Sequence, residues 1–229
     1  MLIKRLIVGA ALLCVAQTAT TATNELGWTL DSALAQIDRQ AQDFNTALAD
    51  VEAQWQAAGA DQPHRTASGR LYVNKEGTLR FKVESPEQRT VLVTKSEVQD
   101  YDPVRALVDR YSLSKHKTRL EPYARLGFTT TGKDLRDDYL VTLLGEDFVN
   151  GRRIVGLELT PKKERAREVV ARLQLWIDQA SWMPVKQVIS HVASGDTLTI
   201  TYYGMARNLK LNPDLFKAKW PKGTQQLKR

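Results

Sequence analysis

Cysteine is almost absent from this sequence of 229 residues, which contains Cys14 and no other cysteine. No disulfide can therefore form within the chain, and its stability has to come from packing. Histidines are also few, and His64, His116 and His191 are isolated, without the spacing of a metal site. The sequence has no phosphate-binding loop, dinucleotide-binding fingerprint or nucleophile elbow. We therefore expect neither an enzyme nor a protein with a metal or another cofactor.

Charge of one sign is not concentrated in any part of the chain. The formal net charge is +7, from 33 basic and 26 acidic residues. Such a balance can favour nucleic acid or an anionic membrane as a partner. Here the charges are scattered and are not clustered with aromatic residues, as a protein that binds single strands would need. We expect a basic soluble protein that contacts membranes only transiently and does not bind nucleic acid.

Long apolar runs are limited to one segment near the start. Two basic residues precede an apolar run over 6–16, and small polar residues follow it. This layout is typical of a secretory signal peptide, and the run is too short for a comfortable permanent anchor. We predict cleavage near Ala22, with Ala19 as the alternative. The expected organisation is a signal peptide over 1–22 and one domain over 23–229 in the periplasm.

The one cysteine lies inside this leader, which raises the alternative of a lipoprotein signal. Such signals place a small residue just before the cysteine, and this sequence has Leu13 there. A plain cleaved signal is therefore favoured, and it would remove Cys14. The mature chain could then fold in an oxidising compartment without disulfides.

Apolar and polar residues alternate from Ala67 to Tyr111. Successive side chains of a strand point to opposite faces, so each run has one apolar face. Turn-forming groups such as Ser85-Pro86-Glu87 separate the runs. Five consecutive strands with short links predict an antiparallel meander. The apolar residues of this pattern are Leu71, Val73, Leu79, Phe81, Val83, Val91, Val93, Val98, Val104, Ala106 and Val108.

A stripe of apolar residues at steps of three and four predicts one long helix from Trp28 to about Ala58. Thr29 is the expected N-cap and Gly59 the expected stop. A coiled coil is the alternative, but a strand-rich remainder favours a helix that packs against a sheet. The stripe consists of Leu30, Leu34, Ile37, Ala41, Phe44, Leu48, Val51 and Trp55.

The segment over 113–138 is broken by proline and glycine, and it predicts short helices around 119–126 and 132–136. Such an insertion between two sets of strands is a candidate lid. Its apolar residues are Leu120, Tyr123, Leu126 and Phe128. Further strands are predicted at 139–144, 153–160, 169–178, 184–192 and 197–203, with a hairpin at Asn150-Gly151 and a basic tail from Lys217 to Arg229.

The predicted fold is mainly β, with about ten strands in a curled sheet, one long helix and a short helical lid. One helix covers only part of the concave apolar face. The interior is then either a filled core or a hydrophobic cavity that accepts an apolar guest. The candidate lining residues of such a cavity are Leu71, Val73, Leu79, Phe81, Val83, Val93 and Trp176. For Trp176 and the others, plain core or rim packing is the alternative.

Several stretches carry a resemblance to a known family. In chain order they are GRLYVNKEGTLRFKVESP, ARLGFTTTGKDL, YLVTLLGEDFVNGRRIVGLELTP, LQLWIDQASWMPVKQV and SGDTLTITYYGMARNLKLNPDLF. As an ordered set they resemble the LolA-type outer-membrane lipoprotein carriers. The resemblance implies an incomplete antiparallel β-barrel with a helical lid over a hydrophobic cavity. It also implies a periplasmic carrier that binds the acyl chains of lipoproteins, with an inner-membrane releasing complex and an outer-membrane receptor as partners.

In the best-known carriers of that family, an arginine after the first strand latches the lid. The matching position here is Lys75, and Glu76 stands in place of the usual proline. Lysine lacks the planar fork of arginine, so the same two-pronged latch is not expected. This departure keeps two alternatives open. One is a carrier of free lipid or another hydrophobic ligand, and the other is a periplasmic module that senses lipid or stress.

Overall fold

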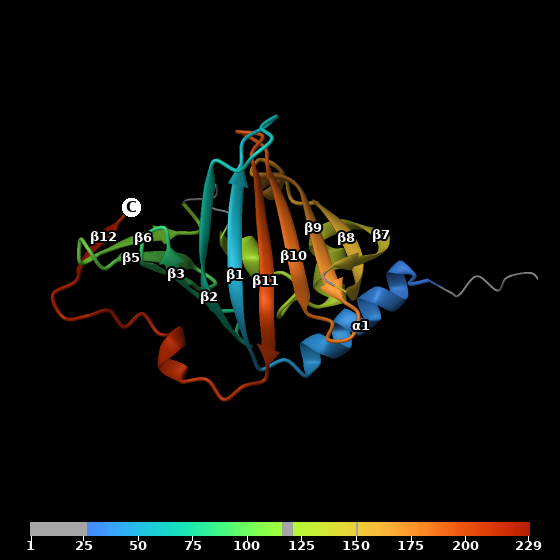
Figure 1. Ribbon diagram of the computed structural model, residues 1–229, viewed down its shortest axis with the longest axis horizontal. Helices are drawn as coiled ribbons and strands as arrows, with labels where there is room; N and C mark the ends of the chain where they lie inside the picture. Colours follow the sequence, from blue (N-terminus) through green and yellow to red (C-terminus); the bar gives the residue numbers. More distant parts are fainter. Residues whose placement is uncertain (1–26, 116–120, 150) are drawn as a thin grey trace, which may run out of the picture.

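The computed structural model describes residues 27–115, 121–149 and 151–229 (Figure 1). The predicted signal peptide with Cys14, the lid residue Leu120 and the turn residue Asn150 lie outside these ranges. The helices are α1 (Leu30–Gln42), α2 (Gly132–Asp138) and α3 (Glu164–Arg167), with 3-10 turns η1 (Glu121–Arg125) and η2 (Pro213–Phe216). The strands are β1 (Thr46–Gln56), β2 (Arg65–Asn74), β3 (Leu79–Ser85), β4 (Arg89–Val93), β5 (Glu97–Asp102), β6 (Leu107–Ser112), β7 (Tyr139–Val149), β8 (Arg152–Pro161), β9 (Val170–Asp178), β10 (Pro184–His191), β11 (Thr197–Arg207) and β12 (Gln225–Lys228).

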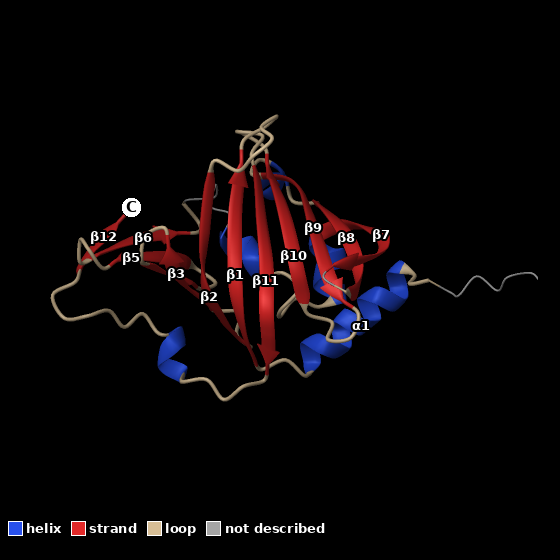
Figure 2. Cartoon of the chain, viewed as in Figure 1, coloured by secondary structure: helices blue, strands red, loops and turns tan. Residues whose placement is uncertain are grey.

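All twelve described strands belong to one sheet, in the order β12-β6-β5-β4-β3-β2-β1-β11-β10-β9-β8-β7. The strands β2 to β6 form one antiparallel meander and β7 to β11 form another. β1 joins the two meanders because it pairs with both β2 and β11. The sheet curls without closing, so β7 and β12 are its two edges (Figures 1 and 2). The predicted fold class, a mainly β curled and open sheet, is confirmed, with two more strands than expected.

The first meander follows the predicted alternation closely. Leu71 on β2 faces Phe81 on β3, so both side chains share the inner face. The placement of Val104 and Ala106 in a strand is wrong. Both lie in the turn before β6, where Val104 is 92% exposed. Asp102 stabilises the turn, because its carboxylate accepts hydrogen bonds from the backbone N–H groups two and three residues further along the chain, at 3.0 and 3.1 Å.

The prediction of one helix from Trp28 to Ala58 is wrong. Thr29 does cap a helix, since its hydroxyl accepts the N–H of Ser32. That helix, α1, ends at Gln42, and the chain turns into β1. Two periodicities coincide beyond this point: residues four apart fit a helix, but they also lie on one face of a strand. The alternate residues Ala47, Ala49, Val51 and Ala53 are buried, and pairing with strands on both sides satisfies the backbone of β1.

The solid core lies between the inner face of β7 to β11 and the helices. α1 buries Leu34 and Ile37 there, and α2 packs on α1. The contact between the two helices requires a glycine, because a Cβ on Gly132 would lie 2.7 Å from the carbonyl oxygen of Leu34. The same glycine donates its N–H to the carboxylate of Asp38 at 2.8 Å. The helices therefore fill one half of the concave side and leave the half formed by β1 to β5 uncovered by α1.

The C-terminal segment runs outside the sheet, from β11 past β2 and β3 to β6 (Figure 1). The guanidinium of Arg80 donates to the carbonyl oxygens of Leu215 and of Lys217, the latter at 2.7 Å. The ring of Trp220 stacks on Tyr101 with centroids 5.1 Å apart. β12 then pairs with β6 in parallel. The sequence predicted only a basic tail here, and the structure makes it the last strand of the sheet.

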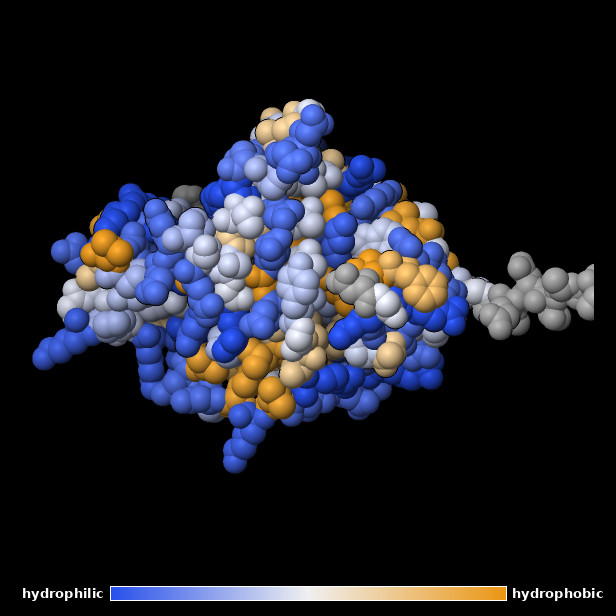
Figure 3. All heavy atoms as spheres, in the orientation of Figure 1, coloured by the Kyte–Doolittle hydropathy of each residue, from blue (hydrophilic) through white to orange (hydrophobic). Residues whose placement is uncertain are grey.

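The face drawn in Figure 3 is mostly hydrophilic, and its apolar atoms form small separate groups. This is the outer side of β1 and β11, where polar side chains alternate with the apolar ones that point inward. Within the described ranges, no helix is long and apolar enough to cross a membrane.

Candidate functional site

A cavity with a volume of about 770 Å³ lies on the inner face of the sheet, between β1 to β5, β11 and the η1 turn. This volume falls within the range of about 300–1,000 Å³ that is common for ligand pockets. Its wall is mainly apolar and consists of Val51, Ala53, Trp55, Ala67, Leu71, Leu79, Phe81, Val83, Pro86, Val91, Val93, Ala124, Leu198, Ile200 and Tyr202. The chain's own side chains do not fill this space, so an apolar molecule could occupy it.

The charged residues of this cavity are Arg65 on β2, Glu87 in the turn before β4, Arg89 on β4 and Asp100 on β5. Arg89 forms ion pairs with Asp102 at 3.2 Å and with Asp100 at 3.4 Å. The guanidinium of Arg65 lies over the ring of Trp55, 3.8 Å from its centroid. These pairings neutralise much of the local charge. The wall around Leu71 and Phe81 therefore stays apolar.

The structure places five of the seven predicted ligand-binding residues on the wall of this cavity, namely Leu71, Leu79, Phe81, Val83 and Val93, and their binding of a ligand stays a prediction. Val73 has no exposed surface and packs within the core cluster, outside the set that borders the space. The structure does not bring Trp176 into the cavity. On β9 the inward side chains are those of Leu173, Leu175 and Ile177. Trp176 has the opposite parity, and its ring covers Gly156 on the outer side of β8.

The predicted lid segment lies beside this cavity, and its role as a lid stays a prediction, since Tyr123 and Leu126 border a second hollow described below. The segment contains η1, where Ala124 borders the cavity, and the turn that follows. Phe128 is fully buried and makes edge contacts with the rings of Phe44 and Tyr202, at centroid distances of 6.5 and 5.4 Å. Leu126 is buried beside it. These two apolar side chains therefore hold the segment against the sheet, together with the hydrogen bonds described next.

Two buried polar side chains of the sheet bind the lid backbone from below. Gln187 on β10 donates its side-chain N–H to the carbonyl oxygen of Leu126 at 2.6 Å. The hydroxyl of Tyr202 on β11 lies 3.3 Å from the carbonyl oxygen of Ala124 and 3.1 Å from the side-chain oxygen of Gln187. Burial raises the pKa of Tyr202, so its hydroxyl stays protonated and able to donate. We call Gln187 and Tyr202 the lid anchor.

The sequence analysis missed the lid anchor, although a signal was present. Gln187 stands at an inward position between Val185 and Ile189, in a strand whose inner face is otherwise apolar. A buried amide needs a partner, so its parity alone predicts a polar contact under the lid. The identity of that partner, a backbone carbonyl 61 residues away, depends on the fold.

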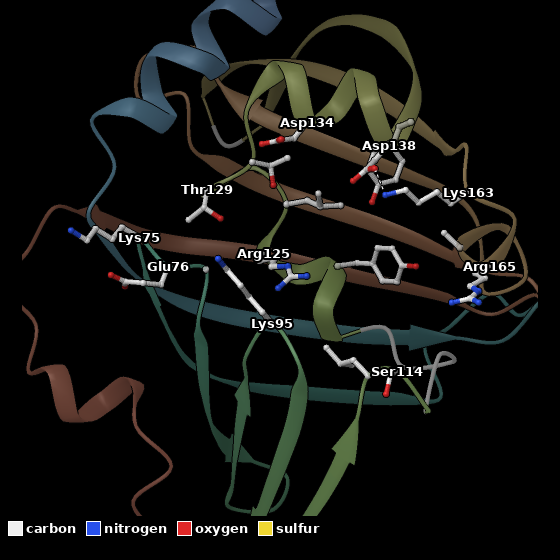
Figure 4. Close-up of a pocket in the computed structure, with 17 residues that line it drawn as sticks. Lys75, Glu76, Lys95, Ser114, Arg125, Thr129, Asp134, Asp138, Lys163 and Arg165 are labelled. Atoms are coloured by element: carbon white, nitrogen blue, oxygen red, sulfur yellow. Dashed lines mark ion pairs between the residues drawn. The ribbon is translucent and has the colours of Figure 1, made fainter.

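A second, polar hollow of about 810 Å³ lies on the other side of the lid (Figure 4). We call it the polar cleft. Its ionisable side chains are Lys75, Glu76, Lys95, Arg125, Asp134, Asp138, Lys163 and Arg165, and its hydroxyl-bearing residues are Ser114, Tyr123, Thr129, Thr130 and Tyr139. Figure 4 shows Arg125 near the middle of this space, and the Lys95 side chain extends into the same space from the turn between β4 and β5. Basic groups outnumber acidic ones in this cleft by five to three.

The acidic residues of the polar cleft are largely engaged. Asp138 forms an ion pair with Lys163 at 2.6 Å, and this hydrogen bond raises the pKa of Lys163. Asp134 caps α2 through Thr131, whose hydrogen bonds lower the pKa of that carboxyl. Burial raises the pKa of the Tyr139 phenol, so it remains neutral. The cleft therefore presents a net positive charge to any ligand.

Lys75 lies in the turn between β2 and β3, at the edge of the polar cleft. Its side chain points away from Arg125 and Thr129 (Figure 4). The turn itself approaches the lid, because a Cβ on Gly77 would lie 3.4 Å from the hydroxyl of Thr129. Among the described residues, no hydrogen bond joins the Lys75 side chain to the lid. A latch role for Lys75 stays a prediction.

No group of three or more histidine, cysteine, aspartate or glutamate residues that could hold a metal ion occurs in the described part of the chain. The strongest side-chain network at the site is the lid anchor, which contacts backbone carbonyls. The chemistry that this arrangement offers is reversible burial of apolar surface beside a basic cleft.

An open, curled sheet with an apolar cavity under a short lid defines a half-barrel binding fold. A family model described as outer membrane lipoprotein carrier protein LolA matches residues 28–219. The chain therefore belongs to the LolA family. A comparison with curated protein sequences gave no match.

Solved structures are similar to this chain at low sequence identity. An uncharacterized conserved protein from Thermus thermophilus is 14% identical, with a TM-score of 0.55 over 87% of this chain and 98% of that one. A LolA superfamily protein from Nitrosomonas europaea is 16% identical, with a TM-score of 0.43 over 83% and 98%. The lipoprotein LppX from Mycobacterium tuberculosis is 14% identical, with a TM-score of 0.45 over 80% and 98%. At such identity the first likeness shows the fold alone.

Proposed function

We propose that this protein is a periplasmic carrier that binds acyl chains in the cavity between β1 to β5, β11 and the lid. The observation that supports this most is an apolar space of about 770 Å³ that borders the described lid. Membership of the LolA family, whose model is described as a lipoprotein carrier, supports the same function. The proposed contact residues are Leu71, Leu79, Phe81, Val83 and Val93, with Tyr123, Leu126 and Phe128 as lid.

The energetics of burial suit a carrier. Each methylene removed from water is worth about 0.8 kcal/mol, so ten methylenes contribute about 8 kcal/mol before the cost of ordering the chain. Displacing the lid breaks the contacts of Leu126 and Phe128, which lowers the net affinity. A receptor with more apolar surface can then accept the load without ATP at that step. The gain from burying the acyl chain and the loss of the lid contacts oppose each other, so the net affinity is moderate and the lipid can be released.

The fuller proposal is transport of lipoproteins from the inner to the outer membrane. It includes export by a cleaved signal peptide, loading by an inner-membrane complex and delivery to an outer-membrane receptor. The alternative is a carrier of free lipid or another hydrophobic ligand, which the lysine at position 75 favours because it cannot form the arginine latch. A module that senses lipid or stress is a further alternative from the same fold class.

Filling the cavity tests acyl-chain binding. The substitution Ala67→Phe places a ring in the cavity, because Ala67 is buried on the inner face of β2 and borders the space. The matched control Thr66→Phe adds the same ring at the exposed neighbouring position, which points outward. Titration of delipidated protein with a neutral pyrene-labelled monoacylglycerol should give saturable binding. Ala67→Phe should abolish most of it, and Thr66→Phe should preserve it.

Absence of saturable binding by the unmodified protein would overturn the proposal. Equal binding by the two phenylalanine variants would place the acyl chain outside this cavity. Native mass spectrometry of the protein, purified from the organism that makes it, then shows which of the proposed ligands is bound. A bound lipoprotein supports lipoprotein transport, and a bound free lipid supports the alternative.

A further inference from the structure

The lid separates two hollows that differ in the number of charged side chains on their walls. Ala124 borders the apolar cavity, and its chain neighbours Tyr123 and Arg125 border the polar cleft. These three residues belong to one 3-10 turn, η1. The residue that borders the apolar cavity is therefore followed in the chain by Arg125, whose guanidinium faces the other hollow. A molecule that extends past this turn would pass from an apolar to a cationic environment.

The cations nearest the partition are available to a ligand. Arg125 lies near the middle of the polar cleft, and the side chain of Lys95 extends into the same space (Figure 4). No carboxylate among the described side chains forms an ion pair with either of them. Two like charges on one small space repel each other unless an anion joins them. Thr129 adds a hydroxyl donor to the same wall.

This set of donors matches a phosphate group. A guanidinium supplies a planar pair of N–H donors, an ammonium supplies a point charge, and a hydroxyl supplies one more hydrogen bond. The three acids in the cleft do not fill this role, because Asp138 is held by Lys163, Asp134 is held by Thr131, and Glu76 points away from Arg125 (Figure 4). The cationic side of the cleft is thus open toward an external anion.

We propose that the polar cleft binds the phosphate head group of an anionic lipid whose acyl chain occupies the apolar cavity. The inference rests on the proposed acyl-chain function and narrows its ligand to an anionic amphiphile. On binding, η1 shifts aside so that the chain lies on its Ala124 side and the phosphate lies against Lys95, Arg125 and Thr129. The head group contributes affinity and fixes the direction in which the lipid enters.

The test compares two lipids with the same acyl chain. Lysophosphatidylglycerol carries the phosphate and monoacylglycerol does not. Both are titrated calorimetrically into delipidated protein below their critical micelle concentrations, so that no membrane surface contributes. The unmodified protein should bind the phosphate lipid about tenfold more tightly, which corresponds to about 1.4 kcal/mol. Raising the salt from about 0.05 M to about 0.5 M should reduce this preference, because the ions screen exposed charges.

The decisive variant is Lys95→Gln with Arg125→Gln. It should lose the preference for the phosphate lipid and bind monoacylglycerol as the unmodified protein does. The control Lys210→Gln with Lys222→Gln removes the same charge from exposed positions on the C-terminal segment and should keep the preference. Arg65→Gln tests the charged residues of the apolar cavity itself and should also keep it.

Each other outcome has a distinct meaning. Equal affinity for the two lipids, or a preference that survives Lys95→Gln with Arg125→Gln, overturns the head-group proposal and leaves acyl-chain binding intact. Loss of the preference in Arg65→Gln alone would place the phosphate in the apolar cavity and overturn it as well. Inorganic phosphate that binds as tightly as the phosphate lipid would make the cleft a site for free anions instead. Failure of both lipids to bind would overturn the proposed function itself.

Discussion

Replacing Gln187 with leucine should loosen the lid without unfolding the sheet. The side chain of Gln187 is fully buried, and its N–H group is 2.6 Å from the carbonyl oxygen of Leu126. Leucine has a similar volume but offers no hydrogen bond. In the closed state the carbonyl of Leu126 would then be buried without this partner, whereas in the open state water can reach it. The substitution therefore raises the free energy of the closed lid relative to the open one.

The size of the effect follows from the cost of a stranded buried acceptor. Leaving such a group unpaired costs about 1–3 kcal/mol. The equilibrium constant for lid opening should rise by about 5- to 150-fold, since about 1.4 kcal/mol is a factor of ten. The hydroxyl of Tyr202, which loses the side-chain oxygen of Gln187 as an acceptor, can move toward the freed carbonyl of Leu126, which would place the result near the lower end.

Amide hydrogen exchange measures this opening directly. The N–H of Leu126 donates to Tyr123 at 3.1 Å and that of Phe128 donates to Arg125 at 3.2 Å, so both amides report on the lid. Their exchange should accelerate in Gln187→Leu. The control Gln174→Leu makes the same change on the outer side of β9 and should leave the lid amides unchanged. The reasoning is refuted if lid exchange in Gln187→Leu stays within twofold of the unmodified protein, or if every strand accelerates equally.

Three further predictions concern other parts of the molecule. Trp220→Ala should let trypsin cut the C-terminal segment faster, because a stacked aromatic pair contributes about 0.5–1.5 kcal/mol beyond its buried area. An unchanged cleavage rate would show that β12 pairing and the Arg80 hydrogen bonds hold the segment without this stack. Gly156→Ala should lower the free energy of unfolding by about 1–3 kcal/mol, because the new Cβ would overlap the ring of Trp176. Adding Trp176→Leu should restore part of that loss in urea denaturation, and no recovery would mean that the strain lies in the backbone. The carboxyl of Asp214, hydrogen-bonded first by Lys219, should titrate by NMR with a pKa of about 2. The lowered pKa means that this carboxylate stabilises the folded chain above pH 3.8, and this stabilisation is lost as the pH falls toward 2. Lys219→Gln should move the pKa of Asp214 upward.

Much of the sheet could be predicted because burial on one face imposes a strict alternation. The inner positions Leu71, Phe81 and Val93 are apolar while their neighbours are polar, so parity alone assigns their face. The same rule would have placed Trp176 outside, since Leu175 and Ile177 occupy the opposite parity. A large aromatic side chain can be accommodated at this outward position because Gly156 on the neighbouring strand leaves room for its ring.

The end of α1 was harder to predict. A spacing of four residues, as between Val51 and Trp55, is compatible with a helix and with one face of a strand. The decision depends on partners far along the chain, because β1 gains hydrogen bonds from β2 and from β11. The strand β12 has no apolar alternation at all, and its pairing with β6 depends on Trp220 and Arg80, which lead the segment there. Such long-range contacts are not encoded in local patterns.

The route of the C-terminal segment has a practical consequence for handling the protein. Because the final residues complete the border of the sheet, any tag fused after Arg229 sits directly beside that border. A truncated chain that stops before Gln225 would instead leave the backbone of β6 open to another molecule, and the shortened protein would be prone to self-association. Purification handles are therefore better placed just ahead of Trp28, two residues before α1 begins at Leu30.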